Sequence, residues 1–133
     1  MLASDARFAT TALKPVTDSD GVVISSSRVR EHLQKAEFAA AEKLLGRAWD
    51  MEDIVVDGDK RGRTIGYPTA NQNVARYIAL SFGVYAVRVK IEDENLWRGG
   101  VANFGIRPMF KSARPLLETY IFDFQKEIYG KNM

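Results

Sequence analysis

The sequence predicts a small, mainly β protein, an antiparallel barrel or sandwich preceded by a short helical extension. Two observations support this class. Apolar residues recur at helical spacing in residues 25–45, whereas apolar and polar residues alternate along several short segments after residue 46. The alternation of strands and helices that indicates a parallel sheet does not occur. With 133 residues the chain is long enough for one hydrophobic core and too short for two domains of usual size.

The first 45 residues contain one predicted strand and two predicted helices. Residues 1–24 end in TDSDGVVI, a turn signal followed by a β-branched run that fits one buried strand. Three serines in SSSRVR favour capping of a helix over about residues 26–35. A second helix, over about residues 37–45, is expected to end at Gly46. Residues 1–24 are expected to be the tail of a larger structural unit.

The remainder of the chain is organised as short strands separated by turns. Asp57 and Gly58 begin a glycine-rich loop that runs through Gly66. Asp93-Glu94-Asn95 separates two alternating segments and predicts a hairpin. The strands are predicted over residues 49–56, 85–91, 96–103 and 116–124.

Composition and charge exclude several classes of function. Lys and Arg number 19 against 17 Asp and Glu, without a block of like charges, so a nucleic-acid-coating arm is not predicted. Cysteine is absent and His32 is the single histidine, so any metal is expected to be a hard ion bound by oxygen. Apolar runs stay well below the ~18 residues that a membrane span needs. We therefore expect a cytoplasmic protein with no membrane partner.

The stretch RGRTIGYPTAN, residues 61–71, suggests a site for a metal and phosphates. Pro68 stiffens the chain, and in an extended chain Thr69 and Asn71 point the same way. A hydroxyl and an amide oxygen suit a hydrated Mg²⁺ that substrate phosphates complete. Backbone N–H groups and cations of the preceding loop could close over those phosphates, from Gly58, Lys60, Arg61, Gly62, Arg63 and Gly66. A hairpin loop with solvated arginines is the alternative interpretation.

Glu118 is the candidate general base. In LLETYIFDF strict alternation places its carboxylate on the same face as Tyr120 and Phe122, among neighbours that would normally be buried. A carboxylate there requires a partner or a function. The alternative is a structural salt bridge with an arginine.

Two further stretches carry weaker signals. In GGVANFGIRPMF, residues 99–110, Asn103, Arg107 and Phe110 could offer an amide, a guanidinium and an aromatic face to a ligand; a glycine-kinked strand before a proline turn is the alternative. In SSSRVR, residues 25–30, the helix start and its arginines could bind an anion, and simple helix capping is the alternative. The residues concerned there are Ser26, Ser27, Arg28 and Arg30.

Taken in order, five motifs resemble one known family. GDKRGRTIGYPTAN, GVYAVRV, GVANFGIRPMF, LETYIFDF and IYGK resemble the riboflavin kinase module of bacterial bifunctional riboflavin kinase/FAD synthetases. ISSSRVREHLQKAEFAAAEKLLGR is similar to the segment that joins this module to the preceding FMN adenylyltransferase domain, whose last nucleotide-binding motif reads like ISSSRVR. The resemblance covers about residues 15–133.

The resemblance implies a six-stranded antiparallel Greek-key barrel that converts ATP and riboflavin to ADP and FMN. Thr69 and Asn71 would hold Mg²⁺ and contact ATP phosphates, and Glu118 would act on the ribityl hydroxyl. The nucleotide-binding set would be Gly62, Arg63, Gly66, Pro68, Thr69 and Asn71, and Asn103, Arg107 and Phe110 would lie near the flavin. Residues 1–46 would be the adenylyltransferase remnant and helical linker, and residues 47–133 the barrel.

The chain also departs from the family pattern. Asp57 stands where many relatives have histidine, and Ile106 and Met109 stand where threonines are usual. The strand-helix unit and histidine motif of the adenylyltransferase domain are absent from this sequence, and the family continues past YGK with a strand and a helix. We therefore expect a C-terminally incomplete barrel and no FAD synthesis.

Two other functions remain open at this point. Small barrels with arginine-rich loops and exposed aromatic residues also bind single-stranded nucleic acid, although the near-neutral charge argues against that partner here. The chain could alternatively bind flavin without turnover. FMN formation from riboflavin, ATP and Mg²⁺ separates the kinase from both alternatives.

Overall fold

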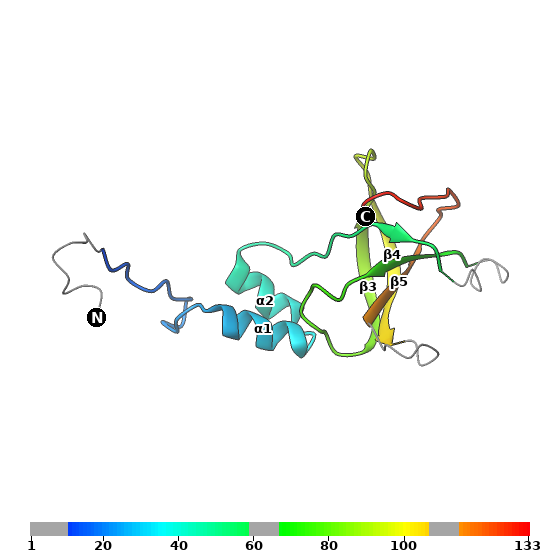
Figure 1. Ribbon diagram of the computed structural model, residues 1–133. Coiled ribbons are helices and arrows are strands. Elements are labelled where there is room, and N and C mark those ends of the chain that lie inside the picture. The colour runs from blue at the N-terminus through cyan, green and yellow to red at the C-terminus, as the bar shows by residue number, and fades with distance from the viewer. Residues whose placement is uncertain (1–10, 59–66, 107–114) are drawn as a thin grey trace, which may run out of the picture.

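The part of the chain that the structure describes forms a five-stranded antiparallel sheet and two helices (Figure 1). The computed structural model describes residues 11–58, 67–106 and 115–133. The strand order in the sheet is β1-β2-β5-β4-β3. The mainly β class predicted from the sequence is thus confirmed. The elements are α1 (Ser26–Gln34), α2 (Phe38–Leu45), β1 (Val55–Val56), β2 (Thr69–Asn73), β3 (Gly83–Lys90), β4 (Trp97–Ile106) and β5 (Pro115–Ile121).

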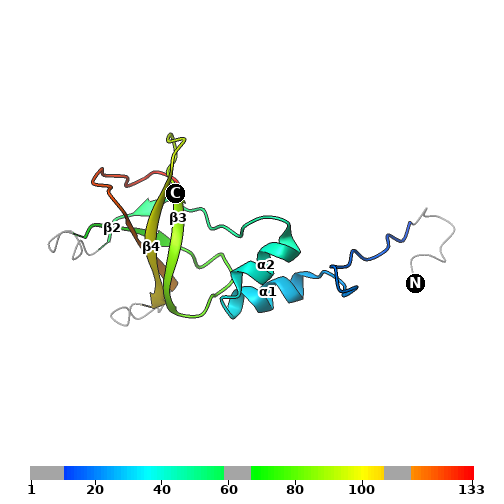
Figure 2. The same cartoon turned by 180° about the vertical axis from the view of Figure 1, so that it is seen from behind.

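Both helices form where the sequence predicts them, and they share a core with the sheet. The Ser25 side chain accepts a hydrogen bond from the backbone N–H of Arg28, which caps α1 as predicted. Leu33 of α1 and Ala41 of α2 belong to one buried cluster with Phe104 of β4. The helix pair therefore covers one end of the sheet, while residues 11–25 extend away from it (Figures 1 and 2). The predicted boundary at residue 46 runs through this continuous core.

Alternation along the strands decides which side chains face that core. On β5 the side chains of Leu117, Thr119 and Ile121 are buried, and the intervening side chains are more exposed. The predicted β3–β4 hairpin is confirmed, with Val84 opposite Asn103. These registers fix which residues share the face opposite the core.

The strands β4 and β5 approach each other closely at Gly100. A Cβ built on Gly100 would lie 2.6 Å from the backbone oxygen of Tyr120, so only glycine fits here without moving the backbone. The glycine pair in GGVANFG therefore has a structural reason, as the glycine-kinked strand interpretation supposes.

Three sequence expectations differ from the structure. The GVVI run is not a buried strand: Val22 is 50% exposed and Val23 46% exposed, and Thr17 and Val23 form a single isolated bridge. The predicted strand 49–56 is reduced to the two residues of β1. Conversely, the residues Thr69–Asn73, for which no strand was predicted, form β2. Packing against β5 and β1 on either side outweighs the loop-forming composition of β2.

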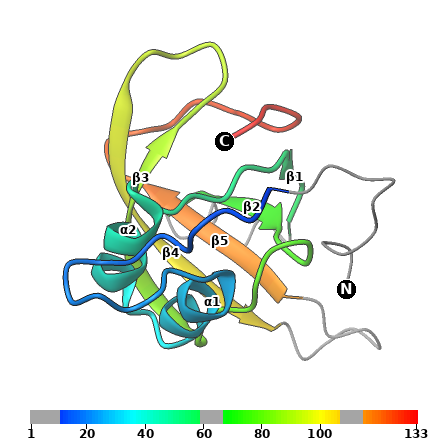
Figure 3. The ribbon, with the colours of Figure 1, turned by 90° about the vertical axis from the view of Figure 1, so that its left-hand side faces the viewer.

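The C-terminal residues return to the sheet beside β1 (Figure 3). The backbone N–H of Val55 donates to the oxygen of Lys131 at 2.9 Å, and Asp53 and Met133 exchange two backbone hydrogen bonds. At the other edge, the N–H of Glu92 donates to the oxygen of Asn132 at 2.8 Å. Residues 131–133 thus contact both β1 and the chain that follows β3.

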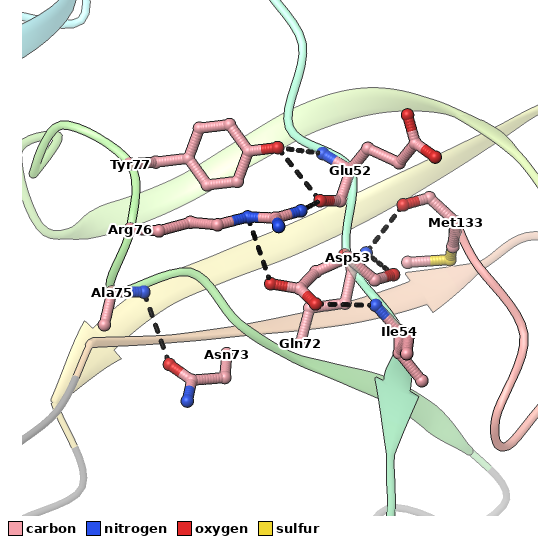
Figure 4. Close-up of polar contacts among 9 residues, drawn as sticks. All are labelled: Glu52, Asp53, Ile54, Gln72, Asn73, Ala75, Arg76, Tyr77 and Met133. Atoms are coloured by element: carbon pink, nitrogen blue, oxygen red, sulfur yellow. Dashed lines mark hydrogen bonds and ion pairs between the residues drawn. The ribbon is translucent and has the colours of Figure 1, made fainter.

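A buried amide locks this arrangement (Figure 4). The Gln72 side chain is 2% exposed, and its Nε2 donates to the backbone oxygens of Asp53 at 2.8 Å and Met133 at 2.7 Å. The Arg76 guanidinium lies 3.5 Å from the Asp53 carboxylate and also donates to the backbone oxygen of Glu52. A single polar side chain on β2 therefore holds β1 and the C-terminal segment together.

Candidate functional site

Three polar residues form a row across neighbouring strands, which is the centre of the candidate site. Asn71 of β2 lies directly opposite Glu118 of β5, and Glu118 lies directly opposite Asn103 of β4. Directly opposed residues of antiparallel strands project from the same face, with Cβ atoms about 4.5–5.5 Å apart. The carboxylate predicted as a base is therefore flanked by two carboxamides, one of them the predicted metal ligand.

Tyr120 is the centre of a second row on the same face, and other aromatic side chains lie beside it. Thr69 lies opposite Tyr120, which lies opposite Val101. The Tyr120 ring contacts the Tyr67 ring edge-on at 5.3 Å between centroids, and the Phe122 ring at 5.9 Å. A planar ligand would find an aromatic surface beside Glu118.

The environment of Glu118 corrects one sequence expectation. Its predicted alternation with Tyr120 and Phe122 is confirmed, but this face is not the buried one. Phe122 is 46% exposed and Glu118 is half-buried, whereas the core side of β5 is formed by the residues between them. The burial that the aromatic neighbours suggested for Glu118 is therefore only partial.

Asn71 is the most enclosed member of the site. It is 4% exposed, and its Nδ2 donates to the backbone oxygen of Thr69 at 3.3 Å. The backbone of Gly58 lies over this carboxamide, because a Cβ built on Gly58 would stand 2.3 Å from Asn71 Nδ2. The side chain is thus held between β2 and the chain that leaves β1.

The oxygen donors of Thr69 and Asn71 fit a magnesium ion. They stand two residues apart on one strand and share a face, as the sequence predicts for an extended chain. Among the described residues, no cluster of three or more His, Cys, Asp or Glu could hold a metal. A hydroxyl and an amide match an ion that keeps several waters and takes its remaining oxygens from phosphates.

A pocket of about 100 Å³ opens on the other side of β2, beside Thr69. Pro68 and Thr69 form one rim, and Phe124 and Tyr129 belong to the segment that follows β5. Its lining includes neither Asn71 nor Glu118. Thr69 therefore stands where the pocket and the Asn71–Glu118 row meet.

Several residues with predicted roles lie outside the described residues, namely Lys60, Arg61, Gly62, Arg63, Gly66, Arg107 and Phe110. Of the predicted flavin group, Asn103 is described, and it is exposed on the face of Glu118. Pro68, predicted to bind nucleotide, is exposed at the start of β2.

The residues of the SSSRVR stretch make contacts of their own at the start of α1. The Arg28 guanidinium lies 2.8 Å from the Asp18 carboxylate and donates to the backbone oxygen of Val23 at 2.9 Å. The hydrogen bond that the Arg28 guanidinium donates to the Asp18 carboxylate lowers the pKa of that carboxyl group. Arg30 donates to the Ser26 hydroxyl at 3.1 Å.

The start of α1 lies apart from the Asn71–Glu118 row. Figure 1 places this end of α1 away from the sheet. Ser27 is exposed there. Nδ1 of His32, further along α1, lies 2.6 Å from the Glu37 carboxylate.

Sequence reasoning missed two features of the site. The contact of Gly58 with Asn71 and the packing of Tyr67 on Tyr120 join residues from different strands and loops. Tyr67 directly precedes Pro68, which restricts its backbone to extended conformations, and this restriction was the signal in the sequence for an aromatic residue held beside the site.

Within the described ranges, the helices are too short to cross a membrane.

Comparison with known proteins identifies relatives of the whole arrangement. The family model for riboflavin kinase matches residues 45–133. A bifunctional riboflavin kinase/FMN adenylyltransferase of Bacillus subtilis (strain 168) is 41% identical over 130 residues, which are 95% of this chain and 40% of that protein. The Haemophilus influenzae protein of the same description is 42% identical over 112 residues, 84% of this chain and 36% of its own length. The chain thus spans about two fifths of the length of these relatives.

A solved structure shares the fold. A crystal structure described as a macrolide-efflux protein from Streptococcus pneumoniae superposes with a TM-score of 0.74 at 39% sequence identity. The superposition covers 89% of this chain and 38% of that one.

Proposed function

The chain belongs to the riboflavin kinase family, and on that premise we propose that it transfers the γ-phosphate of ATP to riboflavin, giving FMN and ADP. The observation that carries the proposal is the direct register of Asn71 with Glu118 on adjacent strands. This register puts the predicted metal ligand and the predicted base within one side-chain length of each other. Phosphoryl transfer requires that combination of positioned phosphate and positioned hydroxyl.

In the proposed reaction Glu118 accepts the proton of the terminal ribityl hydroxyl. The freed oxygen lone pair attacks the γ-phosphorus, the bond to the β,γ-bridging oxygen breaks, and ADP leaves with that electron pair. Thr69 and Asn71 would hold Mg²⁺, which when bound neutralises charge on the phosphate oxygens. The half-buried position of Glu118 leaves its carboxylate accessible to a substrate from the open face of the sheet.

The substrates are proposed to approach from two sides of Thr69. A nucleotide with its phosphates at Thr69 could place its base in the adjoining pocket, against Phe124. The flavin ring is proposed to lie on the aromatic side of Glu118, near Tyr120 and Asn103. Gly62, Arg63 and Gly66 are proposed to fold over the nucleotide, and Arg107 and Phe110 to complete the flavin site.

Two structural parts of the proposal concern the ends of the described chain. The backbone hydrogen bonds that Val55 of β1 and Glu92 donate to the carbonyl oxygens of Lys131 and Asn132 support a proposed sixth strand that closes a Greek-key barrel. Residues 1–46 are proposed to correspond to the linker and the last adenylyltransferase motif of the relatives.

The test is FMN formation by the purified chain supplied with riboflavin, ATP and Mg²⁺, with each component omitted in turn. Asn71→Ala is expected to weaken Mg²⁺-dependent ATP binding measurably and to reduce FMN formation. Asn73→Ala is the matched control, since Asn73 lies two residues further along the same face of β2 and is exposed. Equal losses in both variants, or full activity in Asn71→Ala, would reject the assigned site. Flavin binding without FMN would favour a binding role, and a salt-dependent shift with an oligonucleotide would favour a nucleic-acid-binding barrel.

A further inference from the structure

The chain that leaves β1 passes directly over the Asn71 carboxamide, and Gly58 is its point of contact. A Cβ built on Gly58 would lie 2.3 Å from Asn71 Nδ2, 2.8 Å from Cγ and 3.1 Å from Oδ1. A Cβ essentially never lies within 3.0 Å of another non-bonded heavy atom, and the first two of these distances are shorter than that. The whole amide group, and not one atom of it, occupies the space that any side chain at position 58 would need.

Neither partner has room to yield cheaply. Asn71 is 4% exposed, its side chain is short, and its Nδ2 is already hydrogen-bonded to the backbone oxygen of Thr69. Its strand is paired on both sides, with Val56 of β1 opposite Asn71 and Glu118 of β5 opposite it on the other edge. A methyl group at position 58 must therefore either lift the chain at residues 57–58 or turn the amide out of its place.

Two other glycines of the sheet lack this property. A Cβ on Gly83 would be 3.8 Å from the Tyr85 hydroxyl, and one on Gly105 would be 3.9 Å from Asn103 Nδ2, both ordinary contacts. Neither residue has a positive φ, so alanine is compatible with the backbone at both positions. The close contact at Gly58, by contrast, is made with the amide that the proposed function places at the metal.

We infer that Gly58 is a positioning residue for Asn71: the missing side chain lets the chain close over the carboxamide and fix its orientation. The link from this orientation to Mg²⁺ rests on the proposed function, whereas the contact itself does not. In this role Gly58 acts through Asn71 and not by its own contact with a substrate.

A double-mutant cycle tests the inference, with Gly58→Ala, Asn71→Ala and the double variant measured beside the parent protein. Two readouts are used: the thermal unfolding midpoint without ligands, and Mg²⁺-dependent ATP binding by calorimetry. Gly83→Ala is the matched control, because it makes the same substitution where the methyl group meets only ordinary contacts.

In the presence of Asn71, Gly58→Ala is expected to lower the unfolding midpoint and to weaken Mg²⁺-dependent ATP binding by about tenfold. In the Asn71→Ala background the same substitution is expected to change the midpoint by no more than Gly83→Ala does, and binding by less than about twofold. If Gly58→Ala alone fails to fold, the double variant is expected to regain the folded state, because Asn71→Ala removes the clashing amide.

The outcomes separate this inference from the proposed function. Equal effects of Gly58→Ala in both backgrounds, or no effect in either, would overturn the positioning role of Gly58. A cycle that couples in the unfolding midpoint while Asn71→Ala leaves ATP binding intact would uphold the contact and reject Asn71 as a metal ligand.

Discussion

Replacing Glu118 by glutamine separates a catalytic carboxylate from a structural one. The substitution keeps the side-chain volume and most hydrogen bonding, and it removes the proton acceptor. General-base catalysis contributes about 10²–10⁴ in rate, which corresponds to about 2.7–5.4 kcal/mol of activation free energy. We expect a loss in this range for the phosphoryl-transfer step, with riboflavin and ATP affinities retained.

The structure predicts a small change in stability for the same variant. A deeply buried ion pair costs about 3–5 kcal/mol when one partner is neutralised. Glu118 is half-buried and stands between two carboxamides, Asn71 and Asn103, which can hydrogen-bond either side chain. Because Glu118 is only half-buried, solvent screens the interactions of its charge, and we expect the free energy of unfolding to fall by less than about 1 kcal/mol.

The assay is single-turnover FMN formation at saturating riboflavin and ATP, which reports the chemical step and not product release. Ligand affinity and the urea unfolding midpoint are measured on the same preparation. Glu31→Gln is the control, since Glu31 makes a surface ion pair with Lys35 on α1, away from the sheet. A Glu118→Gln protein that is strongly destabilised but turns over normally would refute the assignment of Glu118 as the base.

Three further predictions address the core, the pocket and the response to pH. Leu33→Ala should lower the free energy of unfolding by about 2–5 kcal/mol, because Leu33 is 3% exposed in the core that the helices share with the sheet. Urea unfolding of this variant should still show a single transition. A separate transition would show that the helices fold independently of the sheet. Phe124→Ala should raise the Kd for ATP and leave the riboflavin Kd unchanged, whereas the reverse would place the flavin in the pocket. Hydrogen bonds from Arg98 and then Lys126 lower the pKa of Glu94 below its usual 4.5, so the stabilisation they give is present above that pH and is lost as the pH falls through the lowered pKa. In an NMR titration, Arg98→Ala should move the Glu94 midpoint back toward 4.5, and an unmoved midpoint would contradict the assigned cause.

Local patterns in the sequence were sufficient for the elements whose formation depends on near neighbours. The helix start at Ser26 follows a serine cap, and the β3–β4 hairpin follows alternation around a turn. The same alternation correctly grouped Glu118 with Tyr120 on one face of β5. It could not tell which face is buried, because period two is the same for both faces and tertiary packing makes the choice.

The candidate site depends on pairings between distant segments, which local patterns do not specify. Asn71 and Asn103 flank Glu118 only because β5 is inserted between β2 and β4 in the sheet. PTAN has a loop-like composition and becomes a strand through those neighbours. The roles of these residues follow from the family resemblance, and the strand register gives a physical basis for testing them.

The central claim is that the Asn71–Glu118 row is where riboflavin meets magnesium ATP. A crystal structure of the protein with riboflavin, Mg²⁺ and a non-hydrolysable ATP analogue tests it most directly. The account predicts oxygen atoms of Thr69 and Asn71 bound to the metal, and the terminal ribityl oxygen within about 2.6–3.2 Å of the Glu118 carboxylate. A riboflavin molecule bound elsewhere, with no ligand atom in reach of Glu118, would contradict it.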